Sequence, residues 1–215
     1  MNVYICMMQK YTTQCNTYII LLAAGASVRM GQPKQLLPIG EQPLLLHTLS
    51  QLLPLSCPII VVLGAFHEQI SPLLYDSPVE VVVNTHWQQG MGSSMKAGLS
   101  MVQTRAPGVS SVLFVVVDQP KLNTALLENM LECYRQHPQP AGCIVAAQYS
   151  NGTLGVPALF GKGWFASLHQ LNNEAGAGVL IRSQQATITP VSFPEGEWDL
   201  DFPSDYFKWK NEDFV

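Results

Sequence analysis

One stretch constrains this chain more than any other: an apolar run that breaks into a loop of small residues. Residues 18–24 form a short, wholly apolar run, which is typical of a β-strand covered on both faces. The chain then passes through Gly25 and Ser27 to Arg29, and the loop closes at Lys34. Small residues let backbone N–H groups approach an anion, while the guanidinium and ammonium groups add two positive charges. The stretch favours a polyphosphate site, with an ordinary glycine-rich turn as the alternative.

The loop is neither of two common phosphate motifs. Gly25 and Gly31 are six positions apart and no Gly-Lys-Ser/Thr sequence follows them, so this is not a Walker loop. The Gly-x-Gly-x-x-Gly pattern of dinucleotide-binding folds does not occur here either.

Further apolar runs alternate with helical patterns along the chain. A repeated strand–helix–strand order predicts a parallel sheet with right-handed crossovers. We therefore expect an α/β fold, a single Rossmann-like domain over residues 17–215 with a doubly wound, mainly parallel sheet, preceded by a loose tail at 1–16. Strands are expected at 18–24, 58–63, 79–83, 112–117 and 143–147, helices at 43–53, 65–74 and 124–137, and one helix capped by Ser93 or Ser94 and ending near Gln103.

Composition excludes several classes of function. Charged residues make up only 12% of the chain, against about 25% in an average protein, and 17 glutamines supply polarity in their place. The net charge is −4, so non-specific binding to nucleic acid or to anionic membranes is not expected. No apolar run reaches the roughly 18 residues of a membrane span. Five scattered cysteines without a C-x-x-C pair favour free thiols in a reducing compartment, and we expect a cytoplasmic protein.

The stretch LAAGASVRMGQPKQLL, residues 22–37, resembles the signature loop of the nucleotidyltransferase superfamily, in particular of the molybdenum cofactor cytidylyltransferases. The resemblance implies a fold of the nucleotide-diphospho-sugar transferase type, in which this loop wraps the triphosphate of a nucleotide. It implies that Arg29 and Lys34 hold the phosphates and act in catalysis. The other positions that it assigns to nucleotide binding here are Ala23, Ala24, Gly25 and Ser27. Guanylyl members of the family read Ala-Gly-Gly where this chain reads Ala-Ala-Gly, so the resemblance implies CTP.

A second segment, NTHWQQGMGSS at residues 84–94, is similar to the family's Asn-x-x-Trp-x-x-Gly-Met-Gly-Ser-Ser motif. That motif implies contacts with the base and ribose from Asn84, Gly90, Gly92 and Ser94. The alternative from the residues alone is a plain strand–turn–helix joint.

Carboxylates stand at two places where a metal site is expected. Asp118 follows the most apolar strand and precedes Gln-Pro, so it lies where open α/β sheets bind ligands. Asp199 and Asp201 alternate on a stretch that we expect to be extended, with both side chains on one face. In the family, Asp118 and Asp201 correspond to the ligands of Mg²⁺, and Asp118 is assigned to catalysis as well. A structural turn at Asp118 and a solvated acidic tail at Asp201 are the alternatives.

The region after residue 150 carries the acceptor side of the resemblance. Gly155 and Pro157 match a Gly-x-Pro-x-Leu-Phe stretch that implies contacts with the acceptor. The family's Leu-x-Gly-Asp-x-Gly-Ala-Arg motif stands here as LNNEAGAG, residues 171–178. Asn173, Glu174 and Gly178 depart from it, and the loss of the last cation predicts a weaker grip on an anionic group.

The resemblance implies transfer of CMP from CTP to the terminal phosphate of a molybdopterin-type cofactor, with release of pyrophosphate. The implied partners are CTP, a phosphorylated small-molecule acceptor and a molybdoenzyme apoprotein. Two alternatives stay open: a cytidylyltransferase for a sugar or polyol phosphate of the methylerythritol type, and a non-catalytic protein that carries the cofactor. The intact cations and paired carboxylates argue against a pure carrier.

Overall fold

A computed structural model describes residues 16–183 and 188–212. Its centre is a seven-stranded sheet in the order β5-β4-β1-β6-β8-β7-β9. The strand pairs β1–β4, β1–β6, β4–β5 and β7–β9 are parallel, whereas β8 is antiparallel to both of its neighbours. The predicted mainly parallel sheet is therefore confirmed. The strands are β1 (Thr17–Ala23), β4 (Ile59–Leu63), β5 (Glu80–Val83), β6 (Ser111–Val116), β7 (Ile144–Gln148), β8 (Leu154–Gly161) and β9 (Thr189–Ser192), and a separate two-stranded ribbon pairs β2 (Pro38–Ile39) with β3 (Gln42–Pro43).

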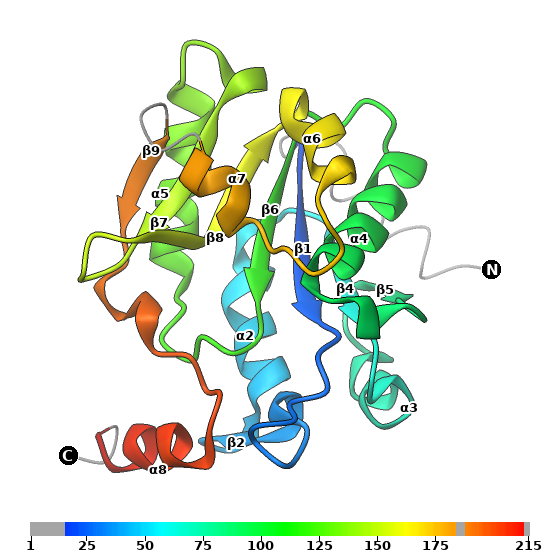
Figure 1. Ribbon diagram of the computed structural model, residues 1–215, viewed down its shortest axis with the longest axis vertical. Coiled ribbons are helices and arrows are strands. Elements are labelled where there is room, and N and C mark those ends of the chain that lie inside the picture. Colours follow the sequence, from blue (N-terminus) through cyan, green and yellow to red (C-terminus); the bar gives the residue numbers. More distant parts are fainter. Residues whose placement is uncertain (1–15, 184–187, 213–215) are drawn as a thin grey trace.

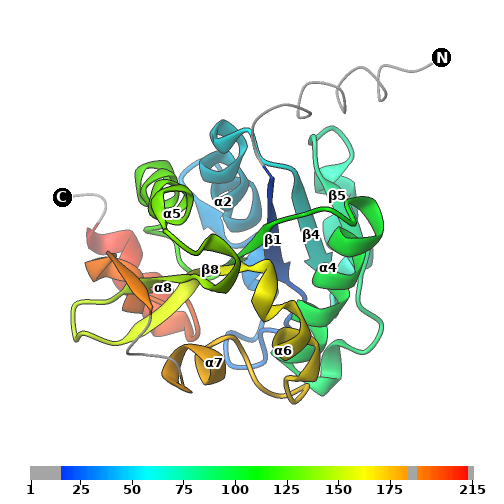
Figure 2. The same cartoon turned by 90° about the horizontal axis from the view of Figure 1, so that it is seen from above.

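Helices cover both faces of this sheet, so the domain is doubly wound (Figure 2). On one face lie α2 (Leu44–Leu52) and α5 (Thr124–Gln136), and on the other lie α4 (Met91–Arg105), α6 (Phe165–Gln170) and α7 (Gly178–Ser183). The remaining helices, α3 (His67–Ile70) and α8 (Pro203–Glu212), lie at the periphery (Figure 1).

The alternation of β1 explains why its sequence is apolar throughout. Ile19 and Leu21 face the core beneath α2 and α5, whereas Ile20 and Leu22 face the core beneath α4. Successive side chains of a strand point to opposite faces, and here both faces are covered. Of the two neighbouring strands, β4 is likewise buried at all five positions, so the prediction of buried central strands is confirmed.

Two helical expectations are corrected. The helix expected at 65–74 splits into α3 and a 3₁₀ helix (Ser71–Leu74), because Pro72 has no N–H to continue the α-helical ladder. No side chain caps α4; its N-cap is Gly90 at φ 109°, and Ser93 and Ser94 lie inside the helix. A positive φ of this size favours glycine, and the two hydroxyls are engaged elsewhere.

The acidic stretch near the C-terminus is not extended. The N–H of Asp199 donates to the carbonyl oxygen of Glu197 at 3.1 Å, and the N–H of Asp201 donates to that of Asp199 at 3.0 Å. Two tight turns therefore replace the expected extended stretch, and the side chain of Asp201 is directed by contacts elsewhere in the fold rather than by alternation.

The cysteine expectation is also corrected in part. Cys57 is disulfide-bonded, whereas Cys133 and Cys143 are free; spacing along the chain does not report which thiols meet in space. Cys6, Cys15 and nearly all of the expected tail at 1–16 lie outside the described residues. Within the described part of the chain, no helix is long and apolar enough to cross a membrane.

Candidate active site at the carboxyl ends of the central strands

The candidate site lies where β1 and β6 end, at the lower edge of the sheet in Figure 1. The two strands are parallel neighbours, so the loop that follows β1 and the turn that follows β6 leave the sheet side by side. The first carries Arg29 and Lys34, and the second carries Asp118. This edge is the usual ligand site of an open α/β sheet.

A buried glutamine holds the loop after β1 in shape. Gln35 is 1% exposed, and its Nε2 donates to the carbonyl oxygens of Ala23 at 2.8 Å and Gly25 at 3.1 Å. The backbone N–H of Lys34 donates to Oγ of Ser27 at 3.1 Å, and Ser27 adopts a left-handed conformation with φ 52°. Ser27 therefore shapes the loop from within. The sequence reasoning missed Gln35, although an amide beside two leucines was a signal of a buried polar contact.

Four predicted residues meet in one cluster of charges. The ammonium Nζ of Lys34 lies 2.6 Å from Oδ2 of Asp118 and 3.0 Å from Oδ1 of Asp201. Arg29 approaches the same Asp201, with Nη2 2.6 Å from Oδ2, and its guanidinium lies 5.2 Å from the ring centroid of Phe202. We call Arg29, Lys34, Asp118 and Asp201 the charge cluster. It joins three segments that are far apart in the sequence.

Two pKa values are raised here, that of Lys34, a member of the charge cluster, and that of the neighbouring Asp199. Burial alone would lower the pKa of Lys34, but the carboxylates of Asp118 and Asp201 outweigh burial and raise it above its ordinary value. The pKa of Asp199 is raised to about 7 by desolvation of its carboxyl group and by the negative charges of Asp118 and Asp201, although Asp199 as a whole residue is exposed. The carboxyl group of Asp199 is thus close enough to be influenced by the charges of Asp118 and Asp201, and further positive charge would relieve the repulsion among the three groups.

The donor set of the charge cluster fits a hard divalent cation. Carboxylate oxygens are the protein ligands that Mg²⁺ uses, and this ion commonly takes only one or two of them together with water and phosphate oxygens. Among the residues that the structure describes, no group of three or more His, Cys, Asp or Glu side chains forms a ready metal cage. Asp118 and Asp201 would therefore supply two ligands of such an ion, and oxygen atoms of water or of a substrate would complete its coordination.

Asn84 and its neighbours behave differently from the charge cluster. Asn84 is buried, and its Nδ2 donates to Oγ of Ser93 at 2.8 Å and of Ser94 at 3.0 Å. Its Oδ1 accepts the backbone N–H of His86 at 2.9 Å. These side chains are bonded to one another, and they hold the turn between β5 and α4 in place. Their predicted contact with a base or ribose stays a prediction.

Gly90 and Gly92 allow a close approach of two segments. A Cβ on Gly90 would lie 2.6 Å from Cα of Glu174, and a Cβ on Gly92 would lie 2.6 Å from the carbonyl oxygen of Ala175. The N–H of Ser93 donates to the carbonyl oxygen of Asn173 at 3.2 Å. We call residues 84–94 together with 172–175 the Asn84 joint. Here the glycines make room for backbone of the same chain.

The departures from the family motif have partners of their own in the structure. Asn173 accepts a hydrogen bond from Nζ of Lys96 at 2.6 Å and donates to Oε1 of Gln89 at 2.7 Å, so it fastens the altered segment to α4. A Cβ on Gly178 would lie 3.1 Å from Nη1 of Arg182. A guanidinium group therefore stands beside the position where the family motif has its arginine.

One of the two predicted acceptor residues, Gly155, lies against a tyrosine. A Cβ on Gly155 would overlap the hydroxyl group of Tyr149, and Pro157 follows a cis peptide bond and is buried in β8. Their predicted contact with an acceptor stays a prediction. Tyr149 was missed by the sequence reasoning, and it had no recognisable signal.

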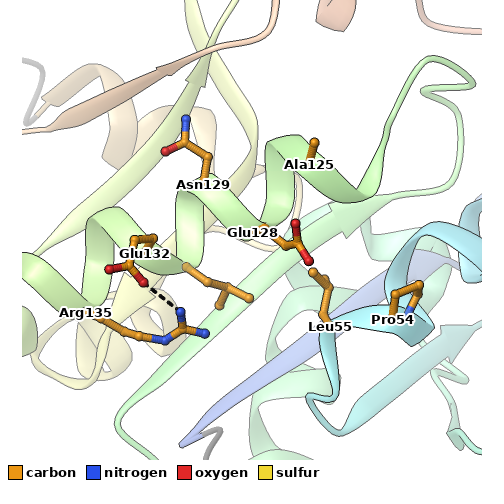
Figure 3. Close-up of a pocket in the computed structure, with 8 residues that line it drawn as sticks. Pro54, Leu55, Ala125, Glu128, Asn129, Glu132 and Arg135 are labelled. Atoms are coloured by element: carbon orange, nitrogen blue, oxygen red, sulfur yellow. Dashed lines mark hydrogen bonds and ion pairs between the residues drawn. The ribbon is translucent and has the colours of Figure 1, made fainter.

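A surface hollow of about 500 Å³ lies away from this site (Figure 3). It is formed by Leu55, which follows α2, and by residues of α5 such as Glu128 and Arg135. The helix α2 begins beside the loop after β1, where the N–H of Leu44 donates to the carbonyl oxygen of Leu37, so its far end reaches the opposite edge of the sheet. None of the residues that line the hollow belongs to the predicted site.

Proteins with an open α/β sheet bind nucleotides at the carboxyl ends of the strands. The fold and the position of the charge cluster are those of this class of nucleotide-binding proteins. Comparison with known families narrows it. A family model described as "MobA-like NTP transferase domain" matches residues 19–188. The chain therefore belongs to the MobA-like nucleotidyltransferase family, which confirms the resemblance found in the sequence.

Individual relatives share between 24% and 31% sequence identity with this chain. The chain is 31% identical over 176 residues to nicotine blue oxidoreductase of Paenarthrobacter nicotinovorans, a match that covers 77% of this chain and 81% of that protein. It superposes on the Rv0371c homologue of Mycobacterium sp. strain JC1 with a TM-score of 0.76 and 26% identity, over 92% of this chain and 96% of the other. The manganese complex of Rv0371c from Mycobacterium tuberculosis H37Rv is 24% identical with a TM-score of 0.73, over 89% and 96% of the two chains, and it shows the shared fold.

Proposed function

We propose that this protein transfers CMP from CTP to the terminal phosphate of a molybdopterin-type cofactor. A terminal phosphate oxygen of the acceptor attacks the α-phosphorus of CTP, and the bond from that phosphorus to the leaving pyrophosphate breaks. The observation that carries the proposal is the charge cluster. It brings two cations and two carboxylates together beside a loop of small residues, whose backbone N–H groups can approach an anion. Positioning and charge neutralisation are what phosphoryl chemistry asks of a protein.

Each member of the cluster has a part in this reaction. Arg29, whose guanidinium is largely exposed, exchanges Asp201 for phosphate oxygens when the nucleotide binds. Lys34 is only 13% exposed and stays beside the α-phosphate, where its charge opposes the charge that develops in the transition state. Asp118 and Asp201 would hold Mg²⁺, which supplies further charge neutralisation on the phosphates. The manganese complex of the structural relative supports a divalent cation in this fold.

The loop after β1 supports the choice of nucleotide. Guanylyl members of the family read Ala-Gly-Gly where this chain has Ala23, Ala24 and Gly25, so the difference lies at Ala24 alone. Ala24 is buried, and its carbonyl oxygen accepts the N–H of Ala65 at 3.1 Å, so this part of the loop is tied to the end of β4. A methyl group at position 24 in a fixed backbone narrows the space beside the base, which favours the smaller cytosine.

A change of acceptor is the first alternative. The altered segment 171–178 supports a sugar or polyol phosphate in place of the pterin, because Asn173 is engaged by Lys96 and Gln89 rather than left as an open glycine. The third possibility from the sequence is a protein that only carries the finished cofactor. The charge cluster argues against it, because a carrier needs no paired carboxylates for a metal ion.

A change of chemistry is suggested by a relative whose name is nicotine blue oxidoreductase. That protein covers most of the chain, so reduction of nicotine blue is a second candidate activity. The charge cluster favours nucleotidyl transfer, because two cations beside paired carboxylates match the charge neutralisation that this transfer requires.

Thermal shift with ATP, CTP, GTP and UTP, each with and without Mg²⁺, tests the choice of nucleotide. A ligand that binds the folded state raises its Tm, and we expect the largest rise with CTP and Mg²⁺. An equal rise with GTP or ATP would contradict the assignment of Ala24.

Pyrophosphate release tests the reaction itself. We expect release with CTP and molybdopterin, none with methylerythritol phosphate, and no reduction of nicotine blue by NADH or NADPH. Asp118→Asn should fold normally and lose about 1,000-fold or more in kcat, the scale of a lost transition-state contact. Near-normal turnover in that variant would move the metal away from Asp118, and release only with methylerythritol phosphate would replace the acceptor.

A further inference from the structure

Tyr149 stands between two glycines that leave room only for its ring. A Cβ on Gly155 would overlap the hydroxyl group of Tyr149, and a Cβ on Gly196 would overlap the edge of its ring. The ring also meets Phe193 edge to face, with centroids 6.4 Å apart. The two glycines lie on different segments, one on β8 and one in the 3₁₀ helix Pro194–Glu197. Tyr149 therefore sets the spacing between these segments.

Hydrogen bonds fix the same arrangement through Gln119, which is 1% exposed. Its Nε2 lies 2.8 Å from the carbonyl oxygen of Gly196, 3.2 Å from that of Val156 and 3.2 Å from the hydroxyl of Tyr149. The hydroxyl of Tyr149 donates to the carbonyl oxygen of Val156 at 2.6 Å. Burial raises the pKa of Tyr149 to about 12, so this hydroxyl remains a donor at neutral pH.

This arrangement connects directly to both carboxylates of the charge cluster. Gln119 follows Asp118 in the chain, so its side chain anchors the peptide that carries the first carboxylate. Gly196 lies five residues before Asp201, and between them the N–H of Leu200 donates to the carbonyl oxygen of Asp118 at 3.0 Å. The segment that carries Asp201 is thus attached to the end of β6 at two points, one through Gln119 and one through Leu200.

We propose that Tyr149 and Gln119 are positioning residues that set the separation of Asp118 and Asp201 for a divalent cation. This inference rests on the proposed function, since it assumes that these two carboxylates hold the metal. Groups that orient metal ligands from behind typically contribute 10–100-fold to metal affinity. Tyr149 and Gln119 touch neither nucleotide nor metal in this scheme and act only through the two carboxylates.

Tyr149→Phe tests the proposal with a matched control. It removes one hydroxyl that donates to a backbone carbonyl, and Tyr134→Phe does the same on α5, where the hydroxyl of Tyr134 donates to the carbonyl oxygen of Ser110 at 2.9 Å. We expect both variants to lower Tm by similar amounts. Calorimetric titration of Mn²⁺ into the substrate-free protein should show about tenfold weaker binding for Tyr149→Phe and unchanged binding for Tyr134→Phe.

A second pair of variants tests spacing without removing any hydrogen-bonding group. Gly196→Ala adds a methyl group against the rings of Tyr149 and Phe193, whereas Gly108→Ala adds one where no heavy atom lies within 4 Å. We expect Gly196→Ala to weaken Mn²⁺ binding and to lower kcat at a fixed metal concentration, with KM for CTP nearly unchanged. Excess metal should restore part of its kcat, and Gly108→Ala should resemble the wild type.

The outcomes separate this inference from the proposed function. If the wild type binds Mn²⁺ and releases pyrophosphate while Tyr149→Phe and Gly196→Ala match their controls, the positioning role is wrong and the proposed function stands. Loss of Tm without loss of metal affinity would reduce Tyr149 to a packing residue and would also overturn the proposal. If the wild type neither binds Mn²⁺ nor releases pyrophosphate, the proposed function itself fails.

Discussion

The charge cluster and the Asn84 joint correspond to equally recognisable sequence motifs, yet they are built in opposite ways. In the charge cluster, the charged atoms of Lys34 and Asp118 contact other members of the cluster and no further polar group among the residues that the structure describes. Their bonds are ion pairs that phosphate or a metal could replace. In the Asn84 joint, the amide of Asn84 is saturated by two serine hydroxyls and a backbone N–H.

The difference shows that a family motif indicates a required local geometry but does not say whether its residues bind a ligand or support the fold. Ion pairs can be exchanged for a ligand, because a phosphate group or a metal ion supplies the opposite charge that each released side chain needs. Buried neutral hydrogen bonds cannot, because an unpaired group would remain. We therefore expect changes in the charge cluster to act on turnover and changes in the Asn84 joint to act on stability.

Of the three changes that compare the charge cluster with the Asn84 joint, Lys34→Ala should have the largest effect. Removal of its charge takes away stabilisation that is greatest in the transition state, so kcat should fall by about 100-fold or more while KM for CTP rises much less. Lys96→Ala is the matched control. It also removes an ammonium group, but that group donates to the amide oxygen of Asn173 rather than to a carboxylate. Steady-state kinetics of both variants decide the matter, and a change confined to KM would make Lys34 a binding residue only.

Gly92→Ala should have an intermediate effect, on folding more than on chemistry. The added methyl group would lie 2.6 Å from the carbonyl oxygen of Ala175 and 3.0 Å from that of Asn173, and backbone cannot move aside as a flexible side chain does. We expect a loss of about 1–3 kcal/mol in the free energy of unfolding, the range for an overpacked site. Urea denaturation measures it, with Ser100→Ala on the exposed face of the same helix as control. Unchanged stability would mean that segment 172–175 is free to leave α4.

Ser94→Ala should have the smallest effect and separates two interpretations of the Asn84 joint. It removes one of the acceptors of Asn84, so a purely structural role predicts a loss of about 1 kcal/mol in stability with KM for CTP unchanged. A hydroxyl that instead contacts the ribose would leave stability nearly intact and raise KM. Denaturation and kinetics on the same preparation distinguish the two.

The sequence by itself determined the secondary structure of the centre and the chemistry available to it. A strand covered on both faces must be apolar at every position, so residues 18–24 and 58–63 were recognisable without any structure. In a chain with only 12% charged residues, Arg29 and Lys34 on one loop of small residues were conspicuous, and Asp118 stood at the end of the most apolar strand.

Only the tertiary structure decided which of these groups meet and which are occupied. Lys34 and Asp201 are 167 positions apart, and local pattern carries no information about a contact formed through space. The alternation argument placed Asp201 on an extended stretch, whereas two tight turns and a hydrogen bond from Leu200 to the end of β6 direct it. Tyr149 had no motif because its place depends on two distant glycines. The burial and the hydrogen bonds of the Asn84 side chain likewise exist only in the folded chain.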